Sequence, residues 1–301
     1  MIEDIFSFFS TWIPEFINAI PTVIVYFPLA LILLVYEIMF SLQFLVAFGL
    51  LFFMYFIFFI KNTYSSKPDD SVVDMLWPIN AIVYGTVFFL FSSPIYVHFV
   101  LFFALSLWGY RLFFNIYDKK RNSKGVEDRR YVELKSHFSK KYYNLERFGK
   151  IYMLQMVLAL FLLLPVMIFM QTTQFYTEIQ DLIFRLGIFI LGAGLFIETL
   201  SDLQLKDFIR HKDKKKKKFC DEGLWAYSRH PNYFGESLFW LGIAVVLFTE
   251  TMFGFLSWML ITFLLTKVSG IPMAERSFKN DPEYKKYQKQ VSPFIIWFRK
   301  N

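Results

Sequence analysis

The sequence predicts an all-α integral membrane protein, a polytopic helical bundle of about seven to eight transmembrane helices. Three observations support this fold class. The chain of 301 residues is 56% hydrophobic, contains 40 Phe and has a mean hydropathy of +0.42, whereas a soluble domain is about 45–50% apolar. Its apolar residues form long blocks, of which residues 22–60 contain no Lys or Arg and a single acid, Glu37. Its basic residues are concentrated between those blocks.

The length of each apolar block sets the number of membrane spans. A spanning helix needs about 20 mostly apolar residues, so a block of about 40 residues is interpreted as two helices joined by a tight turn. The expected spans are 22–39, 42–60, 75–93, 95–116, 151–170, 183–201, 234–250 and 252–268. The first two could instead be one long helix plus a re-entrant piece.

The first residues of the chain are expected to lie on the membrane rather than cross it. Residues 5–20 have the pattern of an amphipathic interfacial helix, interrupted by Pro14. A cleavable signal peptide is not expected, because Glu3 and Asp4 make the start acidic and no small-residue cleavage site follows a basic start.

The basic residues predict the orientation. Residues 117–150 contain eleven Lys or Arg, residues 202–233 contain nine, and residues 267–301 contain eight. An even number of expected spans separates each segment from the next, so all three should face the cytosol, or the matrix of a mitochondrion. The endoplasmic reticulum, the bacterial inner membrane and the mitochondrial inner membrane all fit. The run Lys214–Lys218 favours contact with anionic membrane lipid over direct phosphate binding.

Several kinds of site have no signal in the sequence. Cys220 is the single cysteine, the four histidines form no metal-binding pair, and P-loop and GxSxG motifs are absent. We therefore expect no metal and no nucleic-acid partner. Gly187, Gly192 and Gly194 lie inside a hydrophobic helix, where they predict close helix packing rather than a dinucleotide-binding turn.

The most informative segment is 221–240, which leads from the basic loop into a span. Pro231 can occupy the first turn of a helix, and the free N–H groups of that turn attract anions such as phosphate. The alternative is a basic, aromatic interfacial anchor. An acid about one turn into the hydrocarbon favours a cavity or a partner, because buried charges are costly. The candidate residues are Arg229, His230, Asn232, Tyr233 and Glu236.

A second group of polar residues ends the span 183–201. Glu198 and Asp202 are four residues apart and share a helix face, with Gln204 nearby. These acids could pair with Arg229 and His230, could bind ribose hydroxyls, or could belong to a structural polar network.

A third group follows the span 95–116. Arg111 is the only charged residue of residues 75–116, and it could reach lipid headgroups or clamp a phosphate. Arg130 and Tyr131 follow in the next loop. In the C-terminal tail, Tyr284 could stack on an adenine or pack at the membrane interface.

Six motifs occur in the order found in one known family: V-D-x-x-W, W-G-x-R-L, E-D-x-R-Y, E-x-x-x-D-x-Q, S-R-H-P-N-Y-x-G-E and S-G-I-P-x-x-E. They span residues 73–77, 108–112, 127–131, 198–204, 228–236 and 269–275. The chain thus resembles the steroid 5-alpha-reductase C-terminal-like membrane family over about residues 65–295, and more closely its largely uncharacterised branch, a domain of unknown function. Sterol reductases and isoprenylcysteine carboxyl methyltransferases share the R-H-P-x-Y element.

This resemblance implies an NADPH-dependent oxidoreductase. The cofactor would approach from the cytosolic side, and a lipid-like substrate from the membrane. Residues 1–60 would form an interfacial helix and variable transmembrane helices, and residues 61–301 a membrane domain whose C-terminal half binds the cofactor. Glu198 departs from the steroid reductases, which have Asn at the matching place. The implied cofactor-binding residues are Arg111, Arg130, Tyr131, Glu198, Asp202, Gln204, Arg229, His230, Asn232, Tyr233, Glu236 and Tyr284.

Reduction of a conjugated C=C bond also needs a donor to hold the substrate oxygen. A buried carboxylic acid or a tyrosine can do this, which makes Glu37, Asp74, Tyr84 and Tyr233 the catalytic candidates. The substrate could be a steroid, a sterol or an enone lipid. Two alternatives stay open: a methyltransferase that uses S-adenosylmethionine, and a non-catalytic lipid-binding or structural subunit with partner subunits in a larger membrane complex.

Overall fold

The computed structural model describes residues 41–92, 95–122, 126–171, 177–215 and 217–300. These residues form helices and no β-strand; an isolated bridge joins Ser228 to Ser292. The all-α prediction is confirmed. The expected interfacial helix 5–20, the expected span 22–39 and the candidate Glu37 lie outside the described residues.

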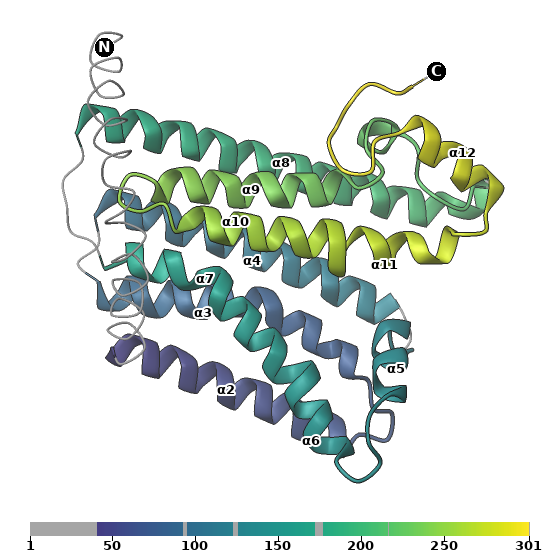
Figure 1. Ribbon diagram of the computed structural model, residues 1–301, viewed down its shortest axis with the longest axis horizontal. Helices are drawn as coiled ribbons and strands as arrows, with labels where there is room; N and C mark the ends of the chain where they lie inside the picture. The colour runs from purple at the N-terminus through teal and green to yellow at the C-terminus, as the bar shows by residue number, and fades with distance from the viewer. Residues whose placement is uncertain (1–40, 93–94, 123–125, 172–176, 216, 301) are drawn as a thin grey trace, which may run out of the picture.

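The helices fall into long membrane-length elements and short ones near their ends (Figure 1). The elements are α2 (Leu42–Thr63), η1 (Asp70–Met75), α3 (Leu76–Phe91), α4 (Tyr96–Asn122), α5 (Arg129–Ser136), α6 (Tyr143–Arg147), η2 (Phe148–Met153), α7 (Leu154–Phe169), α8 (Glu178–Lys215), η3 (Gly223–Ala226), α9 (Pro231–Leu247), α10 (Gly254–Phe263), η4 (Leu264–Val268), α11 (Ile271–Glu275), η5 (Arg276–Phe278) and α12 (Pro282–Gln290).

Within the described residues, six helical stretches are long and apolar enough to cross a membrane, so the protein is an integral membrane protein. They are Leu42–Thr63, Asp70–Phe91, Tyr96–Asn122, Tyr143–Phe169, Glu178–His211 and Gly254–Phe278. The shorter α9 coincides with the expected span 234–250 and has 17 residues. Residues 42–60 lie in one continuous helix, α2. The alternative of one long helix plus a re-entrant piece also involves residues 22–39, which lie outside the described residues.

Glycine allows α8 and α9 to pack closely along their lengths. A Cβ atom added at Gly187 would lie 2.8 Å from the backbone nitrogen of Val246, and one added at Gly194 would overlap the backbone of α9. The prediction of close helix packing is confirmed at these two positions. It is wrong for Gly192, where an added Cβ would have no neighbour within 4 Å.

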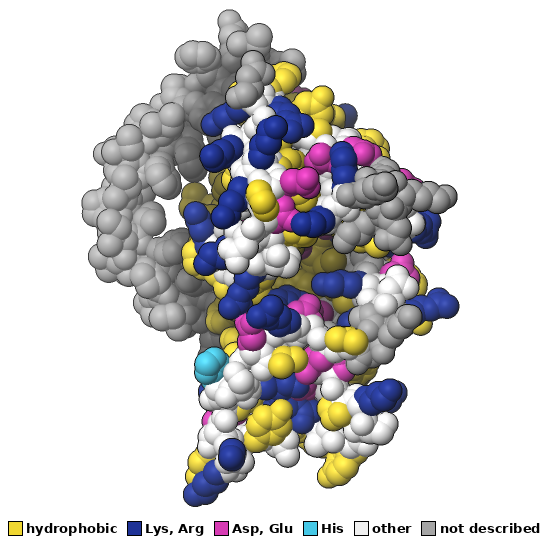
Figure 2. All heavy atoms as spheres, turned by 90° about the vertical axis from the view of Figure 1, so that its right-hand side faces the viewer, with side chains coloured by type: hydrophobic (Ala, Val, Ile, Leu, Met, Phe, Trp, Pro, Cys, Tyr) yellow, Lys and Arg dark blue, Asp and Glu magenta, His cyan; other side chains and the backbone are white. Residues whose placement is uncertain are grey.

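The three basic segments of the sequence meet at one end of the bundle, called here the basic end. It carries α5, α6, α12 and the C-terminal part of α8, which lie together on the right in Figure 1. Figure 2 looks onto this end and shows dark-blue Lys and Arg side chains spread over it, with acids among them and a recess that exposes hydrophobic side chains at its bottom. The expected grouping of the basic segments on one side is therefore present in the structure.

The helix α8 is longer than the sequence predicted. The span was expected to end at residue 201, yet the helix continues to Lys215 and extends beyond its apolar part. The same continuous helix therefore carries Glu198 and Asp202, which face α4 and α9.

A buried aromatic layer lies next to those acids. Trp108 of α4 packs against two residues of α9, with ring centroids 5.4 Å from Trp240 and 5.9 Å from Phe239. All three side chains are almost completely buried. They fix the relative positions of α4 and α9 one turn away from Arg111 and Glu236.

Candidate functional site

Arg111, near the basic end of α4, joins two acids on α8. Its Nη2 contacts Oε1 of Glu198, and its Nη1 lies 2.6 Å from Oδ2 of Asp202. The Asn115 amide, one turn along α4, donates a 2.7 Å hydrogen bond to the same Oδ2. The Asn232 amide of α9 donates to Oδ1 of Asp202 over 3.3 Å. Three helices thus bring these residues into one group, the Arg111 cluster.

Close contact between α8 and α9 completes the Arg111 cluster. A Cβ atom added at Gly235 would lie 2.5 Å from the backbone nitrogen of Glu198. Because Gly235 has no side chain, Glu236, the next residue, is buried close enough to Arg111 and Glu198 to interact electrostatically. Close packing of α8 on α9 therefore explains why the motif at residues 228–236 has glycine at position 235, just before Glu236.

Several polar atoms at this site are buried without a hydrogen-bond partner among the described residues. They include Oε2 of Glu198, Oδ1 of Asn232 and the indole nitrogens of Trp108 and Trp240. Buried polar atoms are nearly always hydrogen-bonded in native proteins, to protein, water or ligand. The two oxygens can accept hydrogen bonds from a bound molecule.

A second group forms around Asp74 of η1, just before α3. Arg130 of α5 approaches Oδ2 of Asp74 to 2.9 Å, and the Tyr131 hydroxyl donates to Oδ1. Gln155 of α7 donates to Oδ1 over 3.2 Å and to the Tyr131 hydroxyl over 2.7 Å. The catalytic candidate Asp74 thus lies at the basic end, engaged by three side chains, and not isolated within a span.

Asp128 ties Arg130 to the start of α5. Its side chain accepts from the backbone N–H of Arg130 over 3.1 Å and from Nε and Nη2 of the same residue over 3.0 Å each. Burial alone would raise the pKa of the Asp128 carboxyl, but these charge-assisted hydrogen bonds outweigh it and lower the pKa to about 2. Asp128 therefore stays ionised at neutral pH and orients Arg130.

Arg229 and His230 pair with Glu275 rather than with Glu198 and Asp202, so the first of the three alternatives for these acids is not found. Nε of Arg229 lies 2.7 Å from Oε1 of Glu275, and Nε2 of His230 lies 3.1 Å from the same oxygen. Arg229 Nη1 also donates to two backbone carbonyls of the C-terminal region. Glu275, which comes from the motif at 269–275, satisfies both residues, and the guanidinium of Arg229 holds the tail in place.

Three further candidates have contacts of different kinds. Gln204 accepts a 2.9 Å hydrogen bond from the backbone N–H of Leu224 and so supports the turn before α9. Tyr284 is buried among aromatic rings of the tail, including Phe278 at 4.7 Å between centroids. Tyr233 stacks on His230, with the ring centroids 5.2 Å apart and the planes at 6°. Of these three residues, Tyr233 lies next to the Arg111 cluster, because it directly follows Asn232 in the first turn of α9.

A buried ion-pair network near α2 was missed by the sequence reasoning. Asp70 is completely buried and lies 2.8 Å from Nε of Arg147 and 2.8 Å from Nζ of Lys135. Tyr152 and Asn62 also donate to it. Only the proximity of Asp70 to the V-D-x-x-W motif hinted at it, and its partners come from four other helical elements, α2, α5, α6 and η2.

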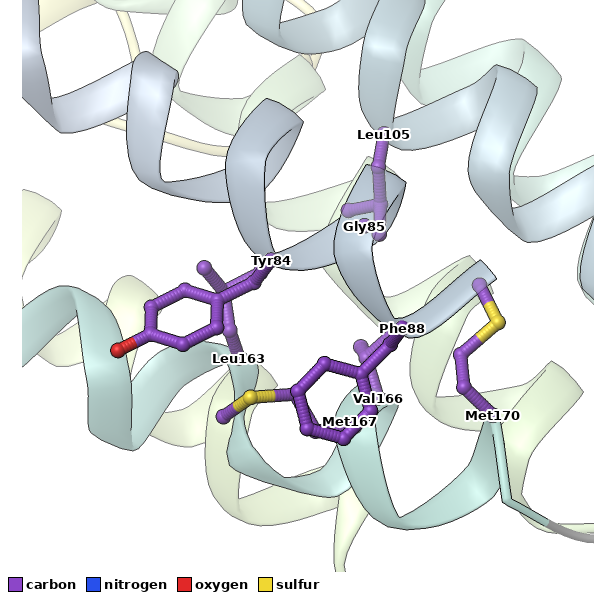
Figure 3. Close-up of a pocket in the computed structure, with 8 residues that line it drawn as sticks. All are labelled: Tyr84, Gly85, Phe88, Leu105, Leu163, Val166, Met167 and Met170. Atoms are coloured by element: carbon purple, nitrogen blue, oxygen red, sulfur yellow. The ribbon is translucent and has the colours of Figure 1, made fainter. Parts of the chain in front are cut away.

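The candidate Tyr84 lies deeper in the bundle, on α3. Its side chain is almost completely buried, and its hydroxyl has no hydrogen-bond partner among the described residues. It borders a pocket between α3, α4 and α7, where Figure 3 shows it beside Phe88, with Met167 and Met170 next to them. The side chains around it leave essentially no room for a water-sized molecule, whereas ordinary ligand sites enclose roughly 300–1,000 Å³. In this conformation it is a gap in the apolar core.

The fold and these clusters define a polytopic α-helical membrane protein with a hydrogen-bonded charged site at its basic end. The chain belongs to the family described as "Protein of unknown function (DUF1295)", which matches residues 57–291. It is also similar to an uncharacterised protein of Schizosaccharomyces pombe, with 25% identity over 256 residues that cover 75% of this chain and 72% of that protein. No solved structure matches the chain.

Proposed function

We propose that this protein is a membrane-embedded oxidoreductase that uses NADPH to reduce a C=C bond of a lipid-like substrate, such as a steroid, a sterol or an enone lipid. The observation that carries the proposal is the Arg111 cluster. It lies at the basic end, directly beside the apolar part of the bundle, and leaves buried acceptor atoms on Glu198 and Asn232. A nucleotide from the aqueous side and a lipid from the membrane can meet at such a place.

The acceptor atoms of the cluster that lack a partner among the described residues fit a nucleoside of NADPH. Ribose hydroxyls and the nicotinamide amide are hydrogen-bond donors, and Oε2 of Glu198 and Oδ1 of Asn232 are buried acceptors. The phosphates need other partners, because Arg111, Arg130 and Arg229 all pair with carboxylates. The lysines of the basic end and the N-terminus of α9 supply positive potential for them.

When bound, NADPH supplies the hydride, and the chain must supply the proton. Three carboxyl groups, those of Glu198, Asp202 and Glu236, surround one guanidinium, so full ionisation would give a net charge of −2 (three negative, one positive). Lys206, the next cation, is already paired with Asp118 at 3.0 Å. Because uncompensated buried charge is very costly, at least one of these carboxyl groups carries a proton.

That proton is held best at the two most buried acids, Glu198 and Glu236. Either one can serve as a general acid next to the reacting carbon. Tyr84 is the better candidate to hold a substrate oxygen than Asp74, because the Tyr84 hydroxyl is unpartnered within the described chain while Asp74 accepts from three side chains.

Ligand-dependent melting of the purified protein tests the cofactor. A ligand at 100 times its Kd stabilises a protein by about 2.7 kcal/mol, so NADPH should raise the melting temperature by several degrees. We expect no such rise with S-adenosylmethionine. Stabilisation by S-adenosylmethionine alone would favour the methyltransferase alternative and overturn the reductase proposal.

Substitutions locate the site. Asn232→Ala and Asp202→Asn should weaken NADPH binding, as should Tyr233→Phe, whereas Asn280→Ala should leave it unchanged because Asn280 is an exposed amide away from the cluster. If NADPH binds equally well to the cluster variants and to the control, the site lies elsewhere. If NADPH binds normally but no enone lipid is reduced, and the protein purifies in a fixed complex, the non-catalytic alternative applies.

A further inference from the structure

The C-terminal tail, residues 291–300, is hydrogen-bonded to the bundle. It follows α12 and turns back toward the start of α9 (Figure 1). The backbone N–H of Arg229 donates to the carbonyl of Ser292 over 2.8 Å, and that of Trp297 donates to the carbonyl of Tyr227 over 3.1 Å. The tail therefore has a defined place beside the segment that precedes α9.

Although it is held in place, the tail exposes its largest apolar side chains. The exposed fractions are 53% for Ile295, 65% for Trp297 and 79% for Phe298. Neighbouring apolar side chains that are ordered and uncovered mark a contact surface, because their exposure to water is unfavourable.

The position of the tail identifies what covers this surface. Phe294 packs edge-on against Phe234, with ring centroids 5.7 Å apart, and Phe234 lies in the first turn of α9. From this turn α9 continues into the apolar part of the bundle. The tail thus lies at the level of the membrane boundary, where Trp and Tyr side chains are enriched in membrane proteins.

The charge of the tail fits the same neighbour. Arg299 and Lys300 follow the aromatic pair, and among the described residues neither forms an ion pair with a carboxylate. Basic side chains close to a membrane surface attract anionic lipid headgroups. We propose that residues 291–300 form an interfacial anchor, in which Ile295, Trp297 and Phe298 insert between lipids and Arg299 and Lys300 bind anionic phospholipid headgroups.

The anchor acts on the segment next to the Arg111 cluster. Nη1 of Arg229 donates to the carbonyls of Gln288 and Val291 over 3.0 and 2.8 Å. Gln288 lies near the end of α12, just before the tail, and Val291 and Ser292 of the tail accept from the side chain and the backbone N–H of Arg229. Fixing the tail in the membrane surface therefore also fixes the residues that lead into α9. This proposal does not depend on the reductase activity.

Site-specific labelling can test the anchor, because Cys220 is the single cysteine. In a Cys220→Ser background, Phe298→Cys would carry an environment-sensitive fluorophore in vesicles of phosphatidylcholine with brominated chains. Lys285→Cys on α12 is the matched control at an exposed position of the same end. We expect the label at 298 to be quenched at least twofold more than the label at 285. Adding phosphatidylglycerol should increase this difference, and Arg299→Gln with Lys300→Gln should abolish the increase.

Two outcomes would overturn the proposal. Quenching at 298 as weak as that at 285, together with quenching by an aqueous quencher, would place the tail in water. Protection of the 298 label from both brominated lipid and an aqueous quencher would mean that protein, such as a second copy of the chain, covers the surface. If phosphatidylglycerol has no effect, the lipid-headgroup role of Arg299 and Lys300 is wrong. Because Phe298 is largely exposed, its replacement leaves the packed bundle intact, and circular dichroism of each variant verifies this.

Discussion

Among single residues, Arg111 supplies the cation on which the buried acids of α8 and α9 depend. Arg111→Gln would leave Glu198, Asp202 and Glu236 without a cation. Breaking a buried ion pair by removing one partner costs about 3–5 kcal/mol, so we expect a loss of that size, measured by unfolding in detergent. Adding Glu198→Gln should recover part of it, because fewer buried charges then lack a partner.

A matched surface pair provides the control for Arg111. Arg185 and Asp181 form an ion pair at 2.8 Å on α8, with side chains 74% and 47% exposed. Exposed pairs of this kind contribute about 0–1 kcal/mol, so Arg185→Gln should have little effect. Equal destabilisation by Arg111→Gln and Arg185→Gln would contradict the view that burial makes the Arg111 pairing essential.

The sequence could identify the charged residues of the site but not their partners. Arg111 stands out as the single charge of an apolar block, and Glu198 and Asp202 stand out through their spacing of four. Arg111 and Asp202 are 91 residues apart, however, and their contact depends on how α4 packs on α8. The sequence left the partners of the acids open, with Arg229 among the alternatives, because local spacing carries no information on such packing.

At the scale of single elements, Asp128 makes the stability of α5 depend on pH. Its folded pKa, about 2, lies below the ordinary value of 3.8. A carboxyl group with a lowered folded pKa contributes stability above its ordinary pKa and loses it as the pH falls through the folded pKa. The difference in melting temperature between the wild type and Asp128→Asn should therefore be constant from about pH 7 to 5 and shrink below about pH 4. A difference that stays constant throughout the acid range would show that the carboxylate charge is unimportant.

The contact between α8 and α9 predicts opposite effects for two neighbouring glycines. Gly194→Ala would push a methyl group into the α9 backbone, and overpacking of this kind costs about 1–3 kcal/mol. Gly192→Ala meets open space, so it should be neutral or stabilise the helix by up to about 1 kcal/mol. Melting temperatures of the two variants in the same detergent test this. Similar destabilisation by both would mean that α8 and α9 pack on a different face.

The extension of α8 shows why hydropathy alone placed its end too early. Hydropathy falls after residue 201, where the sequence becomes charged. Residues 202–215 contain no Gly or Pro, and Lys, Arg, Leu and Gln are good helix formers. The apolar pattern indicates where the membrane ends, whereas the helix continues until local propensity stops it.

At the scale of the whole molecule, apolar blocks made the helical bundle and most span positions predictable, because lipid requires long, internally bonded helices. The span expected at 234–250 is the short helix α9 (Pro231–Leu247), whose length the structure supplies. Its 17 residues span about 26 Å, somewhat less than the roughly 30 Å of a bilayer core. Arg229, before α9, is nevertheless hydrogen-bonded to Ser292, after α10 and α12. Both residues lie on one side, which is expected if α9 crosses in one direction and α10 with its continuation returns.

This crossing makes a testable prediction for the topology of the bundle. In a Cys220→Ser background, Arg129→Cys on α5 and Lys285→Cys on α12 lie at the basic end, and Met252→Cys lies in the exposed connection between α9 and α10. In sealed vesicles of uniform orientation, a membrane-impermeant maleimide should label positions 129 and 285 from one side and position 252 only from the other. Positive charges favour the cytosolic or matrix side for 129 and 285. Labelling of all three from the same side would contradict this topology. It would show that α9 and α10 form a hairpin that enters the membrane without crossing it, an arrangement that also leaves Arg229 and Ser292 on one side.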